Sequence, residues 1–299
     1  MNPVHRAIER VGAFFADRLT RPAYVARGLL NARRPDDEKL VHTLVRERRS
    51  KQRSDGSVAG DLVATAWYVW ELLDLDQGAD SPSVQRAVKW LLARQDKDGA
   101  WAPHQPSRRA AVVDPRFAAM GGFFAYRTSG RTIGRLVLPN GATVTSDAGS
   151  RFLASTFALR SVLRGGRDDD TLVRRHVGSL LALPKLWDTW GGQWNPTLMV
   201  GALAAIAWSP APFRNQLPIL AEHVALNQKP DGSWRNLDIL HAVEALVDVP
   251  LPQSRESVAL AAPRLAKMQT QNGSLGAGTS AEERTLVALR AWLIAREYA

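Results

Sequence analysis

The chain has 299 residues, of which 45% are hydrophobic and 23% are charged, and its net charge is +10. No apolar run of about 18 residues predicts a membrane-spanning helix, and no signal-peptide pattern begins the chain. The absence of cysteine excludes disulfides, thiolate metal sites and cysteine nucleophiles, and is typical of a cytoplasmic protein.

Residues 1–34 are predicted to form a helical extension ahead of a repeat domain over residues 35–299. Apolar residues recur in the extension at helical spacing, with arginines beside them: Val4, Ile8, Val11 and Phe15. A basic amphipathic helix of this kind is suited to an anionic membrane surface. We therefore expect a cytoplasmic protein that can lie at the periphery of a membrane.

A loop motif of the form Gln-x-x-x-Gly-x-apolar recurs along the rest of the chain. Four copies fit it, at Gln52–Val58, Gln95–Trp101, Gln228–Trp234 and Gln269–Leu275. Asp188–Trp194 is an altered copy, and Gly149 marks a sixth position that keeps only the glycine. A period of about 40 residues accommodates two helices and two loops in each unit.

Two kinds of helix alternate around these loops. The first kind is amphipathic and runs into a loop: Ser83–Arg94, Leu217–Asn227 and Val258–Met268. The second kind is apolar on nearly every face, which predicts burial on both sides: Leu62–Leu73, Ser150–Leu163, Pro196–Trp208, Leu237–Val247 and Glu282–Ala295. We predict an all-α fold in which about six helix pairs close into an (α/α)6 toroid, with the second helices lining a central cavity.

An insertion near residues 131–146 is predicted to be a β-hairpin. Asn140-Gly141 is a strong turn signal between β-branched flanks. We expect this hairpin to replace or cover the outer helix of the third pair.

The loops resemble the QW repeats of squalene–hopene cyclases and class II terpene cyclases, and those of protein prenyltransferase β subunits. The resemblance covers about residues 35–299 and implies the toroid fold. In class II cyclases, an Asp-x-Asp-Asp-Thr signature opens an inner helix, and its middle aspartate protonates the substrate. Here Asp61 and Thr65 match that signature, but Val63 stands at the position of the proton donor. In the last repeat, Glu283 stands at the corresponding position.

The aspartate run 168–170 also looks like the signature, but it opens an outer helix and is interpreted as a helix N-cap. The prenyltransferases bind zinc through Asp, Cys and His. A chain without cysteine cannot build that site, so we expect no metal and no cofactor.

Four residues are candidate catalytic groups: Asp61, Asp238, His241 and Glu283. Asp238 and His241 are three residues apart, so they share a helix face and could act as an acid–base pair. Each candidate also has a structural interpretation. Asp61 can cap its helix, the Asp238–His241 pair can be a satisfied contact between helices, and Glu283 can simply occupy a first turn.

Aromatic residues on the predicted inner helices are candidates for substrate binding: Trp67, Trp70, Phe123, Phe124, Phe152, Phe157 and Trp292. Aromatic faces stabilise carbocations by cation–π attraction, but they also fill cores. Arg116, beside the second inner helix, is the candidate for binding an anion. The loop residues Trp101, Trp194 and Trp234 are expected to be structural.

These features predict a terpene cyclase-like enzyme, a lyase or isomerase, that acts on an isoprenoid substrate by acid-initiated cyclisation or isomerisation. One alternative is a non-catalytic toroid that binds a lipid or a partner at an anionic membrane. Another is a toroid enzyme on an anionic polysaccharide, which the basic charge would favour. Nucleic acid is not expected, because no recognition motif accompanies the arginine-rich stretch at residues 46–53.

Overall fold

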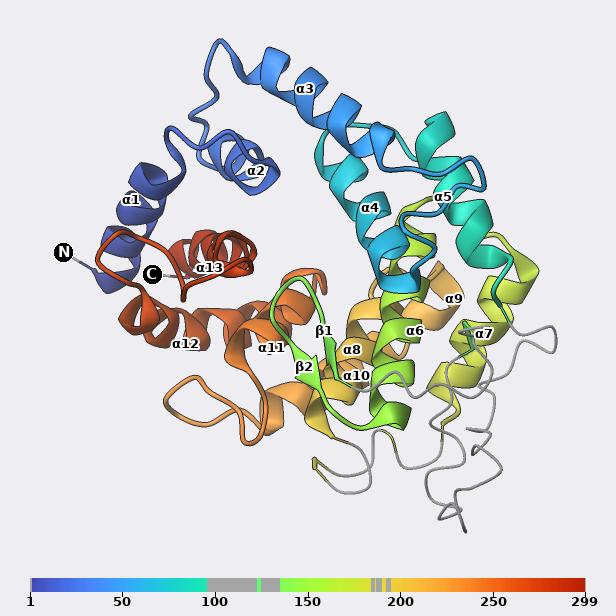
Figure 1. Cartoon of the computed structure of the whole chain (residues 1–299). Coiled ribbons are helices and arrows are strands. Elements are labelled where there is room, and N and C mark those ends of the chain that lie inside the picture. Colours follow the sequence, from blue (N-terminus) through green and yellow to red (C-terminus); the bar gives the residue numbers. More distant parts are fainter. Residues whose placement is uncertain are drawn as a thin grey trace.

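The computed structural model describes residues 2–95, 123–124, 135–183, 186, 190–191 and 195–298. It is mostly helical with one small two-stranded sheet (Figure 1). The elements are α1 (Pro3–Phe15), α2 (Arg21–Leu29), α3 (Asp37–Ser50), α4 (Leu62–Asp74), α5 (Pro82–Leu92), β1 (Leu136–Val137), β2 (Thr143–Val144), α6 (Asp147–Arg164), α7 (Thr171–Leu181), α8 (Pro196–Ile206), α9 (Ala211–Arg214), α10 (Leu217–Leu226), α11 (Ile239–Val247), α12 (Pro252–Met268) and α13 (Ala281–Arg296). The prediction of an all-α fold is confirmed. Within the described ranges, no helix has both the length and the apolar character to cross a membrane.

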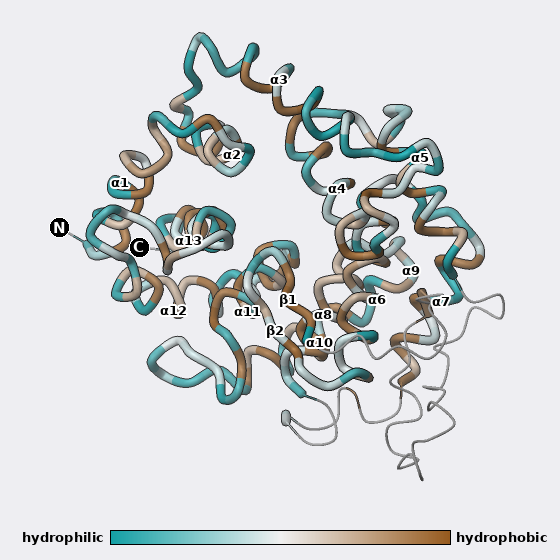
Figure 2. The backbone as a smooth tube through the Cα atoms, in the orientation of Figure 1, coloured by the Kyte–Doolittle hydropathy of each residue, from teal (hydrophilic) through white to brown (hydrophobic). Residues whose placement is uncertain are grey.

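Six helices form a closed series of contacts, in which each helix packs against the next in the order α2, α4, α6, α8, α11 and α13, and α13 packs back onto α2. We call these six helices the closed sequence. Other helices flank this set, and α8 and α3 illustrate how the two groups differ in burial. Figure 2 shows the hydropathy of each residue along the same backbone. Ten of the 11 residues of α8 are buried, whereas α3 buries three of its 14. The difference follows from sequence, because α8 carries apolar residues on every face and α3 is rich in charge.

Two of the repeated loops share one hydrogen-bond pattern. The side-chain amide of Gln52 donates to the carbonyl of Gly56 in its own loop at 3.1 Å and to the carbonyl of Ser83 in α5 at 2.9 Å. The side-chain amide of Gln228 makes the matching bonds, to the carbonyl of Gly232 in its own loop at 3.1 Å and to the carbonyl of Ser257 in α12 at 2.8 Å. The glutamine therefore ties each loop to the outer helix that follows it.

The last loop makes the same contacts with the N-terminal helix. Gln269 donates to the carbonyl of Gly273 at 3.0 Å and to that of Ala7 in α1 at 3.1 Å. Gly273 has a φ of +91°, and a Cβ added there would collide with the backbone oxygen of Arg10. Residues 1–34 were predicted to form a helical extension ahead of the repeat domain. In the structure, α1 and α2 pack against α12 and α13 and close the sequence of helices.

The third unit differs from the prediction. Gly149 was expected to mark a loop, but it lies in the first turn of α6, where its N–H donates to the Ser146 hydroxyl at 3.2 Å. The assignment of a repeat loop to Gly149 was therefore wrong, because a serine cap starts the helix there. The altered loop Asp188–Trp194 and the loop Gln95–Trp101 fall mostly outside the described residues.

The described part of the predicted hairpin is present. β1 and β2 are antiparallel, with Leu136 opposite Val144, and Gly141 in the turn has a φ of +86°. Positive φ at this position is what the Asn-Gly turn signal implied. The turn reaches across to α11 and α13, which places it beside the cavity described next (Figure 1).

Candidate functional site

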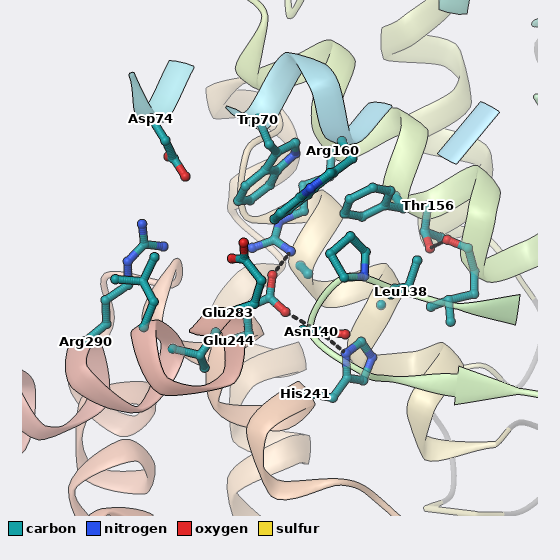
Figure 3. A pocket seen from close by; sticks show the side chains of 18 of the residues that line it. Trp70, Asp74, Leu138, Asn140, Thr156, Arg160, His241, Glu244, Glu283 and Arg290 are labelled. Carbon is teal, nitrogen blue, oxygen red and sulfur yellow. Dashed lines mark hydrogen bonds and ion pairs between the residues drawn. The ribbon is translucent and has the colours of Figure 1, made fainter. Parts of the chain in front are cut away.

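A pocket that is partly open to solvent lies among the six helices of the closed sequence, and its empty space, solvent included, is about 630 Å³. Each of α2, α4, α6, α8, α11 and α13 contributes lining residues, and the hairpin turn adds Leu138, Pro139 and Asn140 (Figure 3). The lining is of two kinds, an aromatic and aliphatic part and a strongly charged part. Such a pocket suits a ligand that has both an apolar part and a polar part.

Three stacked rings form the aromatic wall of the cavity, namely Trp67 and Trp70 of α4 and Phe157 of α6. Their centroids lie 6.2 to 6.4 Å apart, and the planes of Trp67 and Trp70 differ by 16°. The indole N–H of Trp70 donates to the Ser161 hydroxyl at 3.0 Å, which satisfies the one polar atom of that ring. The structure thus brings three of the predicted aromatic residues together at the cavity.

Guanidinium groups already lie over the rings of this wall. The Cζ atoms of Arg160 and Arg164 are 4.1 and 3.8 Å from the Trp70 ring centroid, and that of Arg21 is 4.8 Å from the Trp67 centroid. Cations are attracted to the electron-rich faces of tryptophan, particularly where water is excluded. The aromatic wall is therefore an environment that favours positive charge.

Glu283 is a carboxyl group in this cavity. It lies in the first turn of α13, its side chain is 18% exposed, and it forms an ion pair with Arg21. Arg21, 2% exposed, also pairs with Asp74 at the end of α4. Burial raises the pKa of Glu283, and the positive charge of Arg21 opposes this without cancelling it. Glu283 is thus shifted towards the protonated form.

A second charged group is centred on Arg160 of α6. Its two terminal nitrogens bond Glu244 at 2.8 Å and Asp248 at 2.5 Å, both from the α11 region. The side chain is only 5% exposed, so two carboxylates compensate one buried cation. Burial opposes ionisation of Asp248, but the charge of Arg160 outweighs it and lowers the pKa of that carboxyl group.

His241 and the hairpin turn are joined by a directed chain of hydrogen bonds. The Nε2 of His241 is 3.1 Å from the carbonyl oxygen of Thr197, which can only accept, so Nε2 carries the proton. Nδ1 then accepts from the Asn140 amide at 3.1 Å. The amide also donates to Glu244, while its oxygen accepts the N–H of Ala142 at 2.8 Å. This arrangement needs a neutral imidazole, and burial lowers the pKa of His241 accordingly.

The two predicted aspartates have capping roles. Asp61 caps α4 by accepting the N–H of Ala64 at 2.8 Å. Asp238 caps α11, accepting the N–H of Leu240 at 2.8 Å and the backbone N–H of His241 at 3.3 Å, so it does not touch the imidazole ring. Neither belongs to the described lining of the cavity. The structural interpretation of both positions is the one their contacts support.

Four other predicted aromatic residues are buried among the helices and do not belong to the described lining: Phe123, Phe124, Phe152 and Trp292. Trp292 donates its indole N–H to the carbonyl of Ala262 in α12 at 3.0 Å, and Phe123 stacks on His176 with centroids 3.9 Å apart. The Trp292 contact joins α13 to α12, and the Phe123 contact packs on α7, so these residues stabilise the core. Phe123 and Phe124 were predicted on an inner helix, but Phe124 forms a β-bridge with Gln95 instead. Arg116, Trp101 and Trp194 lie outside the described residues.

Solved structures that resemble this chain include several of one enzyme. No protein-family model matches the chain, and no curated protein matches it. The type II terpene cyclase MstE from Scytonema, without ligand, has a TM-score of 0.56 and 15% identity over 100% of both chains. A variant of it bound to its substrate, geranylgeranyl dihydroxybenzoate, has a TM-score of 0.55 and 15% identity, covering 99% of this chain and 98% of that chain.

A crystal structure of a protein from Actinoplanes has a TM-score of 0.57 and 16% identity, covering 98% of this chain and 99% of that one. The chain has the fold of type II terpene cyclases. At these identities the likeness extends to the fold alone, so the chemistry must be argued from the cavity.

Sequence reasoning missed most of the charged lining, namely Arg21, Asp74, Arg160, Glu244 and Arg290, and it named Asn140 only as a turn residue. Some signals were present. Arg160 interrupts an otherwise apolar inner helix, and a buried arginine needs partners. Glu244 follows His241 by one helical turn, and Arg290 follows Glu283 by two turns, so each shares a face with a residue that was predicted. In the described part of the chain, no group of three or more His, Cys, Asp or Glu residues could hold a metal ion.

Proposed function

We propose that the closed sequence of helices is an (α/α)6 toroid in which α1 and α2 form one of the six pairs. The other pairs are α3–α4, α5–α6, α7–α8, α10–α11 and α12–α13. The support is the loop pattern, since Gln269 bonds α1 as Gln52 bonds α5. In this reading the loops are QW-type repeats, and residues 1–34 belong to the ring.

We further propose that the protein is terpene cyclase-like and binds an isoprenoid chain in the central cavity, where it starts cyclisation or isomerisation by protonation. One observation carries this proposal. Glu283, a carboxyl group whose pKa burial raises, lines the same cavity as Trp67, Trp70 and Phe157. A neutral carboxylic acid beside aromatic faces is what acid-initiated carbocation chemistry needs.

The proposed step moves one proton. The O–H bond of Glu283 breaks as a C–H bond forms at one carbon of a substrate alkene, and the positive charge appears on the other carbon. Arg21 then stabilises the carboxylate that remains, since it already contacts Glu283. The aromatic wall stabilises the carbocation until a later C–H bond breaks and returns the proton, so the net reaction is an isomerisation.

A second candidate function is binding without catalysis. It is favoured by the Arg21–Glu283 ion pair, which stabilises the ionised carboxylate, and by Val63 at the usual position of the donor. In that case the cavity would hold the same kind of apolar ligand but would not convert it. Turnover and binding must therefore be measured separately.

The test compares two neighbouring glutamates. Purified protein is incubated with geranylgeranyl diphosphate, geranylgeraniol and geranylgeranoic acid, and products are identified by gas chromatography and mass spectrometry. Glu283→Gln should reduce product formation by about 100-fold or more. The control is Glu282→Gln, because Glu282 bonds Arg18 at 2.8 Å and Thr20 at 2.6 Å and is not part of the described lining.

Binding is followed by quenching of tryptophan fluorescence, which Trp67 and Trp70 should report. Binding without product in the wild type would favour the second candidate. Absence of both binding and product would contradict both candidates.

A further inference from the structure

Arg290 is a cation of the cavity that forms no direct ion pair with a described carboxylate. It lies on α13 and lines the cavity, and it makes no hydrogen bond or ion pair within the described part of the chain. Arg21 and Arg160, the other two arginines of the lining, each pair with two carboxylates. Figure 3 shows the Arg290 side chain reaching from α13 toward Asp74 and Glu283.

Two neighbouring arginines also retain unused donors. Nε of Arg160 and Nη1 of Arg164 are buried and have no hydrogen-bond partner among the described residues. Burial lowers the pKa of Arg164, the negative charges of Asp74 and Asp248 oppose this, and the positive charges of Arg160 and Arg290 add to it. Of these arginines, Arg160 and Arg290 belong to the described lining. Buried N–H groups without an acceptor cost free energy that an incoming anion would recover.

The charges around the cavity balance only while every carboxyl group is ionised. Four arginines, Arg21, Arg160, Arg164 and Arg290, face four acidic groups, Asp74, Glu244, Asp248 and Glu283. The proposed function requires a proton on Glu283, which leaves four cations against three carboxylates. One positive charge is then in excess, and Arg290 is the arginine of the described lining that forms no ion pair, although its charge also acts on Asp248.

We propose that the ligand is an isoprenoid with a singly charged anionic head, a carboxylate, which binds Arg290 while its chain lies along the aromatic wall. The inference rests on the proposed function and adds the chemical class of the head group. A planar guanidinium can bind a carboxylate through two parallel hydrogen bonds. The ligand charge would complete the neutral set of groups around the cavity.

The same balance of charged groups around the cavity disfavours a ligand with a diphosphate head. Its several negative charges would meet one excess positive charge, with Asp74 and Asp248 close by. Like charges in a partly dry cavity repel strongly, and no residue of the described lining is left to offset them. The cavity should therefore discriminate between two anions that share one isoprenoid chain.

The test uses three probes with the same chain, namely geranylgeranoic acid, geranylgeraniol and geranylgeranyl diphosphate. Their dissociation constants are measured at about pH 7, where the free acid is ionised. The wild type should bind the acid more tightly than the alcohol or the diphosphate. Arg290→Gln should weaken acid binding by about 10-fold or more, the loss expected for a hydrogen bond to a charged group, and leave alcohol binding unchanged.

Two further variants sharpen the result. Glu283→Gln keeps a neutral side chain at this position but cannot donate the proposed proton, so it should bind the acid as tightly as the wild type does, and weaker binding would contradict the inference. The control is Arg296→Gln, the same change at an exposed position of α13, which should alter neither affinity.

The outcomes separate this inference from the proposed function. If the alcohol binds as tightly as the acid, or if Arg290→Gln weakens both equally, the carboxylate site is wrong and the isoprenoid cavity stands. Tightest binding of the diphosphate would also overturn the inference. If none of the probes binds, the proposed isoprenoid function fails and this inference fails with it.

Discussion

The starts of α4 and α13 show how one local scaffold carries different chemistry. In α4, the Thr65 hydroxyl accepts the N–H of Val58 at 3.0 Å and donates to the carbonyl of Asp61 at 2.6 Å. In α13, the Thr285 hydroxyl likewise accepts the N–H of Leu275 at 2.8 Å and donates to the carbonyl of Ala281 at 2.6 Å. Both threonines are fully buried, and each fastens a loop to the helix that follows it.

Two residues before each threonine, the helices diverge. Val63 is half-buried and packs against the core, whereas Glu283 enters the cavity and pairs with Arg21. The backbone hydrogen bonds are common to both repeats, so they cannot specify the reaction. A single side chain, with the groups that the rest of the ring places around it, makes the difference.

Exchanging these two side chains should have the largest effect. Glu283→Val is expected to reduce turnover by about 100-fold or more, because it removes the proposed proton donor. Adding Val63→Glu should not restore turnover, since Val63 does not belong to the described lining. Product formation by the single and double variants is the measurement. Recovery in the double variant would show that the two helix starts are interchangeable and that Glu283 has been placed wrongly.

The loops before these helices should be sensitive to glycine replacement. Gly273→Ala forces a residue with φ of +91° into contact with the α1 backbone, whereas Gly278→Ala meets nothing within 4 Å at a φ of +80°. Left-handed strain of roughly 1–2 kcal/mol is common to both variants, so any larger loss at Gly273 measures the closure onto α1. Denaturant unfolding of the two variants provides the comparison. Equal losses would argue that α1 does not close the ring.

The pH dependence of stability should be the smallest effect and is specific to α13. A raised pKa means that folded Glu283 binds its proton at a pH where an unfolded glutamate, near 4.3, has lost it. Stability should therefore rise as the pH falls through the folded pKa, and the cost of the buried carboxylate is fully present above it.

Relative to Glu283→Gln, the wild type should thus gain about 1 kcal/mol or less as the pH is lowered from neutral towards about pH 5. Unfolding free energies of both proteins across this range are the measurement. A constant difference, or one of opposite sign, would show that the carboxyl group is ionised throughout.

Much of the fold could be predicted from the sequence because its signals are local. Apolar spacing marks the helices, and glutamine and glycine at fixed spacing mark the loops, whatever lies across the ring. The prediction failed at Gly149, where a serine cap overrides the glycine, and it did not foresee that Gln269 of the last loop bonds α1. Contacts between chain ends leave no trace in local spacing.

The candidate site could be predicted only in part. Glu283, His241 and three of the seven predicted aromatic residues line the cavity, and each was found on the face of an apolar helix. Asp61 and Asp238 carry the carboxyl group that a catalytic acid needs, but their carboxylates cap helices. A cap and a catalytic acid look alike in sequence, because both are acidic residues at a helix start.

By itself, the sequence determined the helices, their alternation between exposed and buried kinds, and the loops that join them, since these depend on spacing along the chain. Only the tertiary structure decided that Arg21 meets Glu283, that Asn140 bonds His241, and that Arg290 lines the cavity without a direct ion pair to a described residue. Those contacts join residues more than a hundred positions apart, or depend on what every other helix places in the cavity. Their electrostatics therefore exist only when the ring is assembled.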